Sequence, residues 1–260
     1  DTLETANGSG SITINNPINT AGITSVTLGT SNFVAGVNAG NSITSGGNYN
    51  TVVGDEAGTA ITTGDHNTAV GYSSLVANTT GGQNTASGFK AMFSNTTGED
   101  NTATGYQALY ANTTGASNAA YGLFALSANT TASSNTAVGH SSLKANTTGA
   151  SNVAVGMGAL DANTTGTENV AVGKGALGAN TTAIKNTAVG ESALITNTTG
   201  ANNTALGYGT LYSNTTANDN VAVGFAAMET NTTGASNTAL GKAALFANTT
   251  GNANVAIGAI

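Results

Sequence analysis

The chain has no cysteine, no arginine and no tryptophan, and Pro17 is its only proline. The absence of cysteine excludes disulfides, thiolate metal sites and cysteine nucleophiles, and it suits a chain outside a reducing compartment. Five lysines against twelve acidic residues give a net charge of -7 and no basic patch. We therefore expect neither nucleic acid nor an anionic membrane surface as a partner. No apolar run has the length of a spanning helix, so we expect no membrane insertion in this segment.

Large apolar side chains are also scarce, because most of the apolar residues are alanine and valine. A globule of 260 residues with this composition would lack both core volume and a charged coat. Disordered linkers are usually rich in proline and net charge, which does not fit this chain either. The composition therefore favours neither an ordinary globule nor a linker.

A repeat of seventeen residues occupies most of the chain. Asn recurs in one register from Asn50 to Asn254, which gives thirteen copies, and a Gly stands four residues after each of these Asn. Counting that Asn as position 1, the consensus is N-[TV]-A-V-G-x-x-[AS]-L-x-A-N-T-T-[GA]-x-x. From residue 67 on, position 3 is always Ala, and position 9 is Leu or Met in all eleven complete copies.

The repeat defines the organisation of the chain. Residues 50–260 form the array, whose last copy is incomplete, and residues 32–49 form a degenerate copy that is one residue longer. Residues 1–31 lie outside the register, but SITIN and ITSVTLG alternate as strands do, which suits a β cap or a junction to another module. Because the chain begins with Asp1 and stops within a copy, we expect it to be a piece of a longer, extracellular protein.

The period and composition predict an all-β fold, a parallel β-solenoid or β-roll with one coil per seventeen residues. Helical solenoids have longer repeats, and β-branched residues with Gly and Asn favour strands and turns. We expect one strand at positions 2–4 and a second at positions 9–11, with positions 2, 4, 9 and 11 facing the coil interior. Gly at position 5 and Asn-Thr-Thr at positions 12–14 predict two corners, with stacked Asn side chains forming amide ladders.

One such coil buries little apolar surface for the number of residues that it orders, so we expect the interior of a single chain to be underfilled. Under this interpretation position 3 points out of the coil, yet it is never larger than Ala and never polar after residue 67. A uniform outer Ala column suggests contact with sister chains, and three copies would supply the missing burial. The candidate inter-chain residues are Ala69, Ala86, Ala103, Ala120, Ala137, Ala154, Ala171, Ala188, Ala205, Ala222, Ala239 and Ala256.

The NTAVG and NVAVG starts of the copies resemble the head repeats of trimeric autotransporter adhesins. The longer form, with G-Y-x-A-L and N-T-T-G, is similar to repeat arrays of phage tail fibres and bacterial surface proteins. The resemblance covers residues 50–260 and loosely 32–49. It implies a homotrimeric, left-handed parallel β-roll fibre used as a shaft or an adhesive head, located on a virion tail or a cell surface.

Catalytic and metal-binding chemistry has little support in the sequence. Asp55 with Glu56 and Glu99 with Asp100 are adjacent pairs that would point to opposite faces, and His66 and His140 lie four to five coils apart. Acidic residues are scattered over several repeat positions, unlike the fixed Asp of calcium-binding solenoids. We therefore expect no enzyme and no cofactor. The Asn-Thr-Thr motifs are formal N-glycosylation sequons, but a buried Asn ladder could not carry a glycan.

The variable positions 6 and 10 are the candidates for recognition. They carry aromatic residues in some copies and Lys or Glu in others, which predicts exposure. Aromatic residues on neighbouring coils would stack about 4.8 Å apart and either shield the coil edge or bind a cell-surface glycan or protein receptor. The candidate recognition residues are Tyr72, Phe89, Phe93, Tyr106, Tyr110, Tyr208, Tyr212, Phe225 and Phe246.

The sequence thus predicts a structural fibre segment whose main partner is itself. Two alternatives stay open. An ice-binding solenoid would use ranks of Thr, although Thr-Thr at positions 13 and 14 points to two sides. A monomeric polysaccharide-processing β-helix is the weaker alternative, because the catalytic groups are missing.

Overall fold

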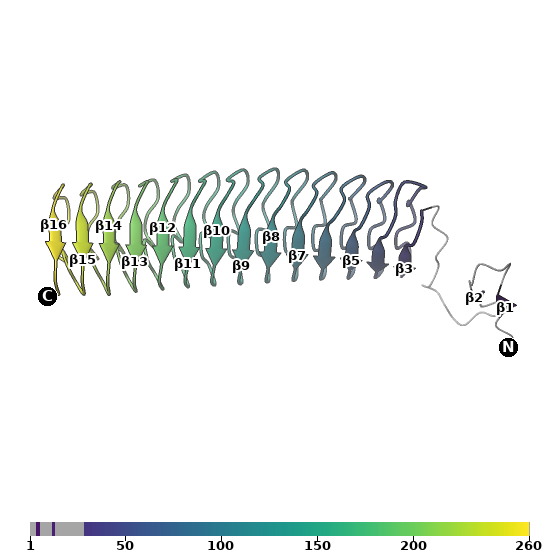
Figure 1. Cartoon of the computed structure of the whole chain (residues 1–260), viewed down its shortest axis with the longest axis horizontal. Helices are drawn as coiled ribbons and strands as arrows, with labels where there is room; N and C mark the ends of the chain where they lie inside the picture. Colours follow the sequence, from purple (N-terminus) through teal and green to yellow (C-terminus); the bar gives the residue numbers. More distant parts are fainter. Residues whose placement is uncertain (1–3, 6–11, 14–28, 260) are drawn as a thin grey trace.

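One three-residue strand recurs in every coil of the array, always at positions 2–4. The computed structural model describes residues 4–5, 12–13 and 29–259. Within them, fourteen strands form one parallel sheet in chain order, which confirms the predicted all-β solenoid (Figure 1). The strands are β3 (Phe33–Ala35), β4 (Thr51–Val53), β5 (Thr68–Val70), β6 (Thr85–Ser87), β7 (Thr102–Thr104), β8 (Ala119–Tyr121), β9 (Thr136–Val138), β10 (Val153–Val155), β11 (Val170–Val172), β12 (Thr187–Val189), β13 (Thr204–Leu206), β14 (Val221–Val223), β15 (Thr238–Leu240) and β16 (Val255–Ile257).

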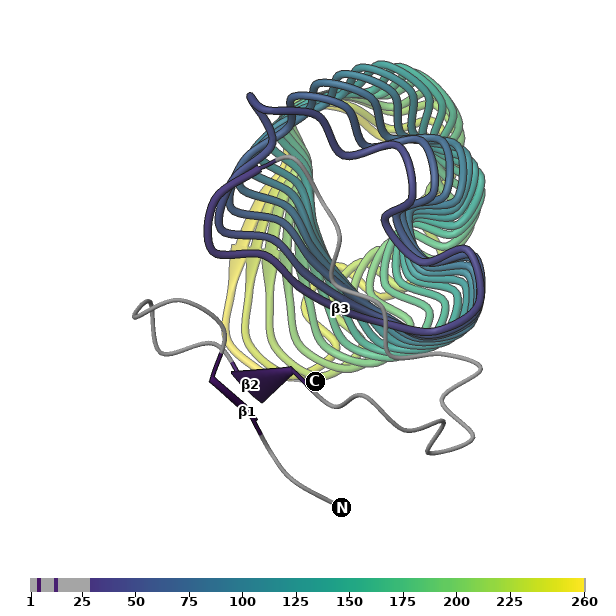
Figure 2. The same ribbon diagram turned by 90° about the vertical axis from the view of Figure 1, so that its right-hand side faces the viewer.

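The coils stack in strict register. Each strand residue pairs with its equivalent one coil away, as Thr102 does with Ala119. Seen end-on, the coils superpose as successive turns of one tube (Figure 2). The degenerate copy also supplies a coil, because β3 pairs with β4 at an offset of eighteen residues, Phe33 with Thr51. Constant register makes every repeat position a column that runs the length of the tube.

Before the array, β1 (Glu4–Thr5) and β2 (Ile12–Thr13) pair antiparallel. The expected strand in ITSVTLG, residues 23–29, lies almost wholly outside the described residues.

Gly at position 5 makes the corner that ends each strand, as predicted. Gly88 has a φ of 137°, where side chains other than hydrogen are strongly disfavoured. An added Cβ at Gly88 would lie 2.5 Å from the carbonyl oxygen of Gly105 in the next coil. Both the dihedral angle and the close approach of neighbouring coils therefore require glycine.

The second strand, predicted at positions 9–11, is absent from the coils, and that prediction was wrong. Positions 6–11 form turns in which two residues, at positions 7 and 9, have left-handed backbone, such as Gln107 and Leu109 with a φ of 52° each. Backbone hydrogen bonds still join the coils here, for example from the Leu109 N–H to the Ala125 oxygen at 3.0 Å. Each left-handed residue costs about 1–2 kcal/mol. Full burial of the Leu109 side chain contributes about 1.5–3 kcal/mol in the opposite direction.

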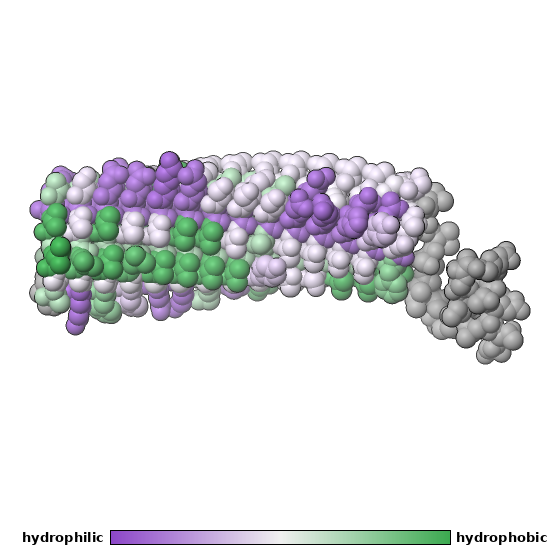
Figure 3. All heavy atoms as spheres, in the orientation of Figure 1, coloured by the Kyte–Doolittle hydropathy of each residue, from purple (hydrophilic) through white to green (hydrophobic). Residues whose placement is uncertain are grey.

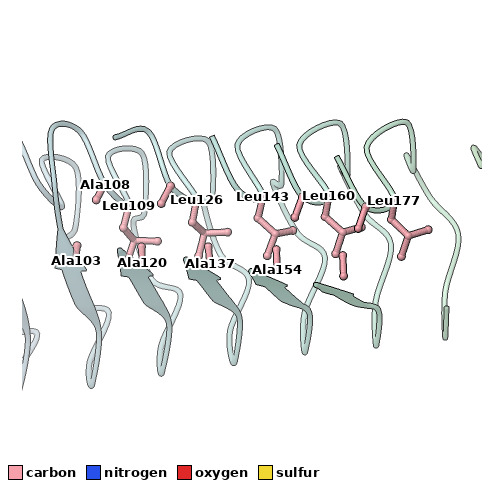
Figure 4. Close-up of a cluster of buried hydrophobic side chains, with 14 of the residues drawn as sticks. Ala103, Ala108, Leu109, Ala120, Leu126, Ala137, Leu143, Ala154, Leu160 and Leu177 are labelled. Carbon is pink, nitrogen blue, oxygen red and sulfur yellow. The ribbon is translucent and has the colours of Figure 1, made fainter. Parts of the chain in front are cut away.

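The alanines at position 3 face the coil interior, so the prediction that they contact a sister chain was wrong. Figure 4 shows Ala103, Ala120, Ala137 and Ala154 pointing from the strands toward the leucines of position 9, and all of these side chains are buried within one chain. The corrected residues are Ala69, Ala86, Ala103, Ala120, Ala137, Ala154, Ala171, Ala188, Ala205, Ala222 and Ala239, which are buried, and Ala256 in the last coil, which is half-buried. The large side chain at position 9 leaves room for only one methyl group at position 3. This explains why position 3 is Ala in every coil that has Leu or Met at position 9.

The interior also contains two columns of buried Asn side chains, whose polar groups are all hydrogen-bonded. At position 1, the Asn84 Nδ2 donates to the Gly98 oxygen at 2.8 Å, and the Asn84 Oδ1 accepts the Asn101 N–H at 3.0 Å. At position 12, the Asn95 Nδ2 donates to the Asn78 Oδ1 at 2.8 Å and to the Gly98 oxygen at 3.0 Å. Among the described residues, no buried side-chain nitrogen or oxygen lacks a partner. The predicted amide ladders are confirmed, and they close each coil by tying its start to its end.

The first two coils fill the same space differently. In the coil that begins at Asn50, position 3 is Val52, position 9 is Gly58 and position 12 is Ile61. All three are buried, and an added Cβ at Gly58 would lie 2.7 Å from the Ile61 Cδ1. Isoleucine from position 12 thus replaces both the leucine and one Asn column of later coils.

Candidate functional surfaces

The outer face of the sheet is formed by positions 2 and 4 of every strand. No strand from β3 to β16 has a charged residue at either position. From β9 to β16, position 4 is always Val, Leu or Ile, and Figure 3 shows the resulting apolar stripe over these strands. Sheets that face water usually alternate apolar and polar residues, so this face is atypical of a free surface.

Positions 2 and 4 are predicted to face the coil interior, but in the structure they lie on the outer face of the sheet. Val70 and Leu206, both at position 4, are exposed, whereas Ala69 and Ala205 between the flanking residues are buried. The signal that would have found this surface is the uniform absence of charge at positions 2 and 4. It was misinterpreted because larger apolar residues usually mark the interior.

The lateral face lies beyond the corner glycine and holds positions 6 and 10. The aromatic residues predicted there are mostly exposed. Those with large exposure are Tyr72, Phe89, Tyr106, Tyr208, Tyr212, Phe225 and Phe246, while Phe93 and Tyr110 are half-buried.

Neighbouring aromatic residues form ladders. Tyr72, Phe89 and Tyr106 stack at position 6, with ring centroids 5.5 Å and 5.1 Å apart. Phe93 and Tyr110 stack at position 10, with centroids 5.1 Å apart. These two ladders form one aromatic patch over three coils.

A second and shorter ladder occurs toward the C-terminal end of the array. Tyr208 and Phe225 stack with centroids 5.4 Å apart. Tyr212 and Phe246, at position 10, make no ring contact in the described part of the chain. The structure therefore brings seven of the nine predicted aromatic residues into two separate sets and leaves Tyr212 and Phe246 outside them.

Between these sets the lateral face is hollowed. Position 7 is Gly158 and Gly175 in successive coils and position 10 is Gly178, and a hollow of about 400 Å³ opens beside them. Met157, Asp161, Lys174, Ala179 and Ile195 complete its lining. Partial burial raises the pKa of the Asp161 carboxyl above its usual value of 3.8, although the Lys144 ammonium acts in the opposite direction. Small residues at positions 7 and 10 were the signal for this hollow, which sequence analysis missed.

The acidic residues and histidines do not converge. Asp55 accepts the Val37 N–H at 3.1 Å, Glu56 accepts the Ser73 hydroxyl at 3.1 Å, and His66 stacks on Tyr49. No group of three His, Cys, Asp or Glu side chains with metal-binding geometry exists within residues 29–259 or the short strand pair before them. No helix in the described ranges is long and apolar enough to cross a membrane.

The Asn-Thr-Thr sequons lie at the Asn column of position 12. Asn78 through Asn231 of this column are buried, and only Asn248 near the end of the array is partly accessible. Their amides are engaged in the ladders, so a folded coil does not present them to a glycosyl carrier.

Comparisons with protein-family models, curated proteins and solved structures find no match to this chain.

Proposed function

We propose that the chain is a structural segment of a fibre, a phage tail fibre or a bacterial surface adhesin, in which three copies associate through the outer sheet face. One observation carries the proposal: position 4 forms an apolar stripe from β9 to β16, and neither position 2 nor position 4 carries a charge from β3 to β16. A long apolar stripe of this kind is typical of a surface that another chain covers. The number three comes from the resemblance to trimeric adhesins and tail-fibre repeats.

The mechanical role follows from the repeat. Each coil adds about 4.8 Å to the length of the rod, the spacing of paired strands. Paired strands and satisfied Asn ladders connect every coil to the next, so length is proportional to copy number. A rod of this kind separates a tip from a base and needs no catalytic group. We place it outside the cell, on a virion or a cell surface.

A lysine on the sheet face tests the proposal. Leu206 at position 4 and Ile184 at position 16 have nearly equal exposed fractions, 37% and 38%, but only Leu206 lies on the sheet face. Native mass spectrometry of the chain should give a trimer that Leu206→Lys converts to monomers, because three buried ammonium groups would face one another. The matched variant Ile184→Lys should remain trimeric. A wild-type chain that stays monomeric at micromolar concentration would contradict the proposal.

Ice binding is the second candidate, and one observation favours it. In β7, Thr102 and Thr104 lie on the outer face of the sheet, on either side of the inward-facing Ala103. Thr also occupies position 2 in β4, β5 and β6. The position 2 threonines of β4 to β7 pair in register and form one column along the sheet. Thermal hysteresis of the wild-type chain, lost in Thr102→Lys, would support ice binding, and its absence would remove this candidate.

A further inference from the structure

The aromatic patch of the N-terminal half has displaced rings. The planes of Tyr72 and Phe89 differ by 17° and those of Phe89 and Tyr106 by 8°, while their centroids are 5.5 Å and 5.1 Å apart. Parallel rings in direct contact at such separations must be offset, so each overlaps only part of the next. The exposed fractions of 45%, 39% and 45% agree with this. The ladder therefore presents three partly open ring faces at a regular step along the solenoid.

A single ammonium group lies between the two ladders of the patch. The Lys90 Nζ is 5.4 Å from the ring centroid of Phe89 at position 6 and 5.2 Å from that of Phe93 at position 10. In the described part of the chain Lys90 makes no ion pair. Contact with both rings holds the ammonium beside the open ring faces, where it can donate hydrogen bonds to hydroxyl groups.

The charge of the surroundings restricts the ligand. The chain has no arginine, and acidic residues exceed lysines by twelve to five. Asp55 occupies position 6 in the coil before Tyr72 and continues the column of the ladder. An anionic polymer would meet repulsion along this surface, because Lys90 is its one cation among these coils. A neutral molecule with apolar faces and hydroxyl edges suits the patch best.

The step of the ladder identifies the class of molecule. An extended β-linked pyranose chain advances by nearly the same step per residue as the ladder does per coil, so successive sugar faces can lie over successive rings. We propose that Tyr72, Phe89, Tyr106 and Lys90 bind a linear, neutral, β-linked oligosaccharide that runs parallel to the solenoid axis. The site lies within three consecutive coils of one chain and does not depend on the fibre proposal.

Titration calorimetry of the full chain with two glucose hexamers tests this site. Cellohexaose is β-linked and extended, whereas maltohexaose has the same composition but a curved, α-linked backbone. The wild-type chain should bind cellohexaose at least about tenfold more tightly than maltohexaose, because only the extended chain keeps register with three rings. Equal affinities, or no binding of cellohexaose at millimolar concentration, would overturn the proposal.

A pair of matched variants locates the binding. Phe89→Ser removes the middle ring and both of its stacks, and Phe225→Ser removes a ring of the two-ring ladder that has no lysine contact. Other coils carry Lys174 or Glu191 at this position, so a polar residue there is compatible with the coil. Phe89→Ser should weaken cellohexaose binding about tenfold, and Phe225→Ser should change it less than about twofold.

Further controls separate binding from a structural role of the rings. Lys90→Gln should weaken binding while leaving the thermal midpoint unchanged, since the lysine is not part of the core. Equal losses from Phe89→Ser and Phe225→Ser would contradict a specific site. Native mass spectrometry of Phe89→Ser gives the last check, because a change in oligomeric mass would place the ladder at a subunit contact and would overturn the proposal.

Discussion

The inner and outer faces of each strand accept different residue types, although residues of the two faces alternate along only three positions. In β9, Ala137 faces the interior, and its position is Ala in every copy from residue 67 on. Thr136 and Val138 face outward, and in the complete copies from residue 67 on their positions vary among Thr, Val, Ala, Ser, Tyr and Leu. Inside, a leucine and two Asn columns fix the available volume. On the outer face the residue types vary, but none of them is charged. The interior is thus specified by shape and the outer face by the absence of charge.

The largest effect is expected where inner backbones approach each other. Gly139→Ala should cost about 4 kcal/mol, because the new Cβ would meet the backbone of Gly156 at 2.8 Å and φ is 130°. Gly158→Ala is the matched control. Its φ is 65°, but no atom lies within 4 Å of the added Cβ, so about 1 kcal/mol is expected. Hydrogen exchange should show loss of protection near Gly139 and little near Gly158, and equal losses would contradict the account.

The second largest effect is expected from the buried leucine column of the core. Leu143→Ala should cost about 3 kcal/mol, because Leu143 is fully buried and its loss leaves a cavity between coils. Val138→Ala on the outer face should cost less than about 1 kcal/mol in the isolated chain, since Val138 is exposed. Denaturant unfolding monitored by circular dichroism would compare them. A Val138→Ala cost as large as that of Leu143→Ala would mean that the outer face is already covered.

A smaller effect is expected from the Asn ladder. The Asn146 Nδ2 donates to the Asn129 Oδ1 at 3.0 Å and to the Gly149 oxygen at 2.9 Å, and its Oδ1 accepts from Asn163 at 2.8 Å. Asn146→Ala leaves these buried groups unpaired and should cost about 2 kcal/mol. Thr148→Ala, two positions along at the exposed corner, should be near neutral. Equal thermal midpoints for the two variants would refute the role given to the ladder.

The smallest effect depends on pH. The pKa of Asp161 is raised in the folded chain, so its contribution favours folding below the unfolded value of about 3.8 and is lost as pH rises through the folded pKa. Asp161→Asn should therefore raise the thermal midpoint slightly at pH 7 relative to wild type, and the difference should shrink at pH 3. A difference independent of pH would contradict this cause. The expected change in thermal midpoint is small because the Asp161 carboxyl is largely exposed.

Much of the fold was predictable because the repeat reports the coil directly. The seventeen-residue register, the strand at positions 2–4, the corner at Gly88 and its equivalents, and the Asn ladders all follow from residue types with narrow structural uses. The turn at positions 6–11 was not predictable. Leucine rarely adopts left-handed backbone, so Leu109 gives no sign of the conformation that the stacked coils impose on it.

The candidate surfaces were predicted in part. Exposure of Tyr72 and its ladder partners could be inferred because charged residues replace them in other copies. The position of Lys90 between two ladders depends on two columns that only the folded turn brings together. The same holds for the hollow beside Gly175.

The sequence by itself determined that this chain is a stack of similar coils, because a strict period gives each repeat position the same environment in successive coils. The tertiary structure decided which side of each strand is inside. Alternation along a strand defines two faces but does not say which one is enclosed, and the small interior left by Leu109 and its equivalents accepts Ala rather than Val. That choice moves the apolar residues of position 4 to the outside, where they form the surface that we propose for association.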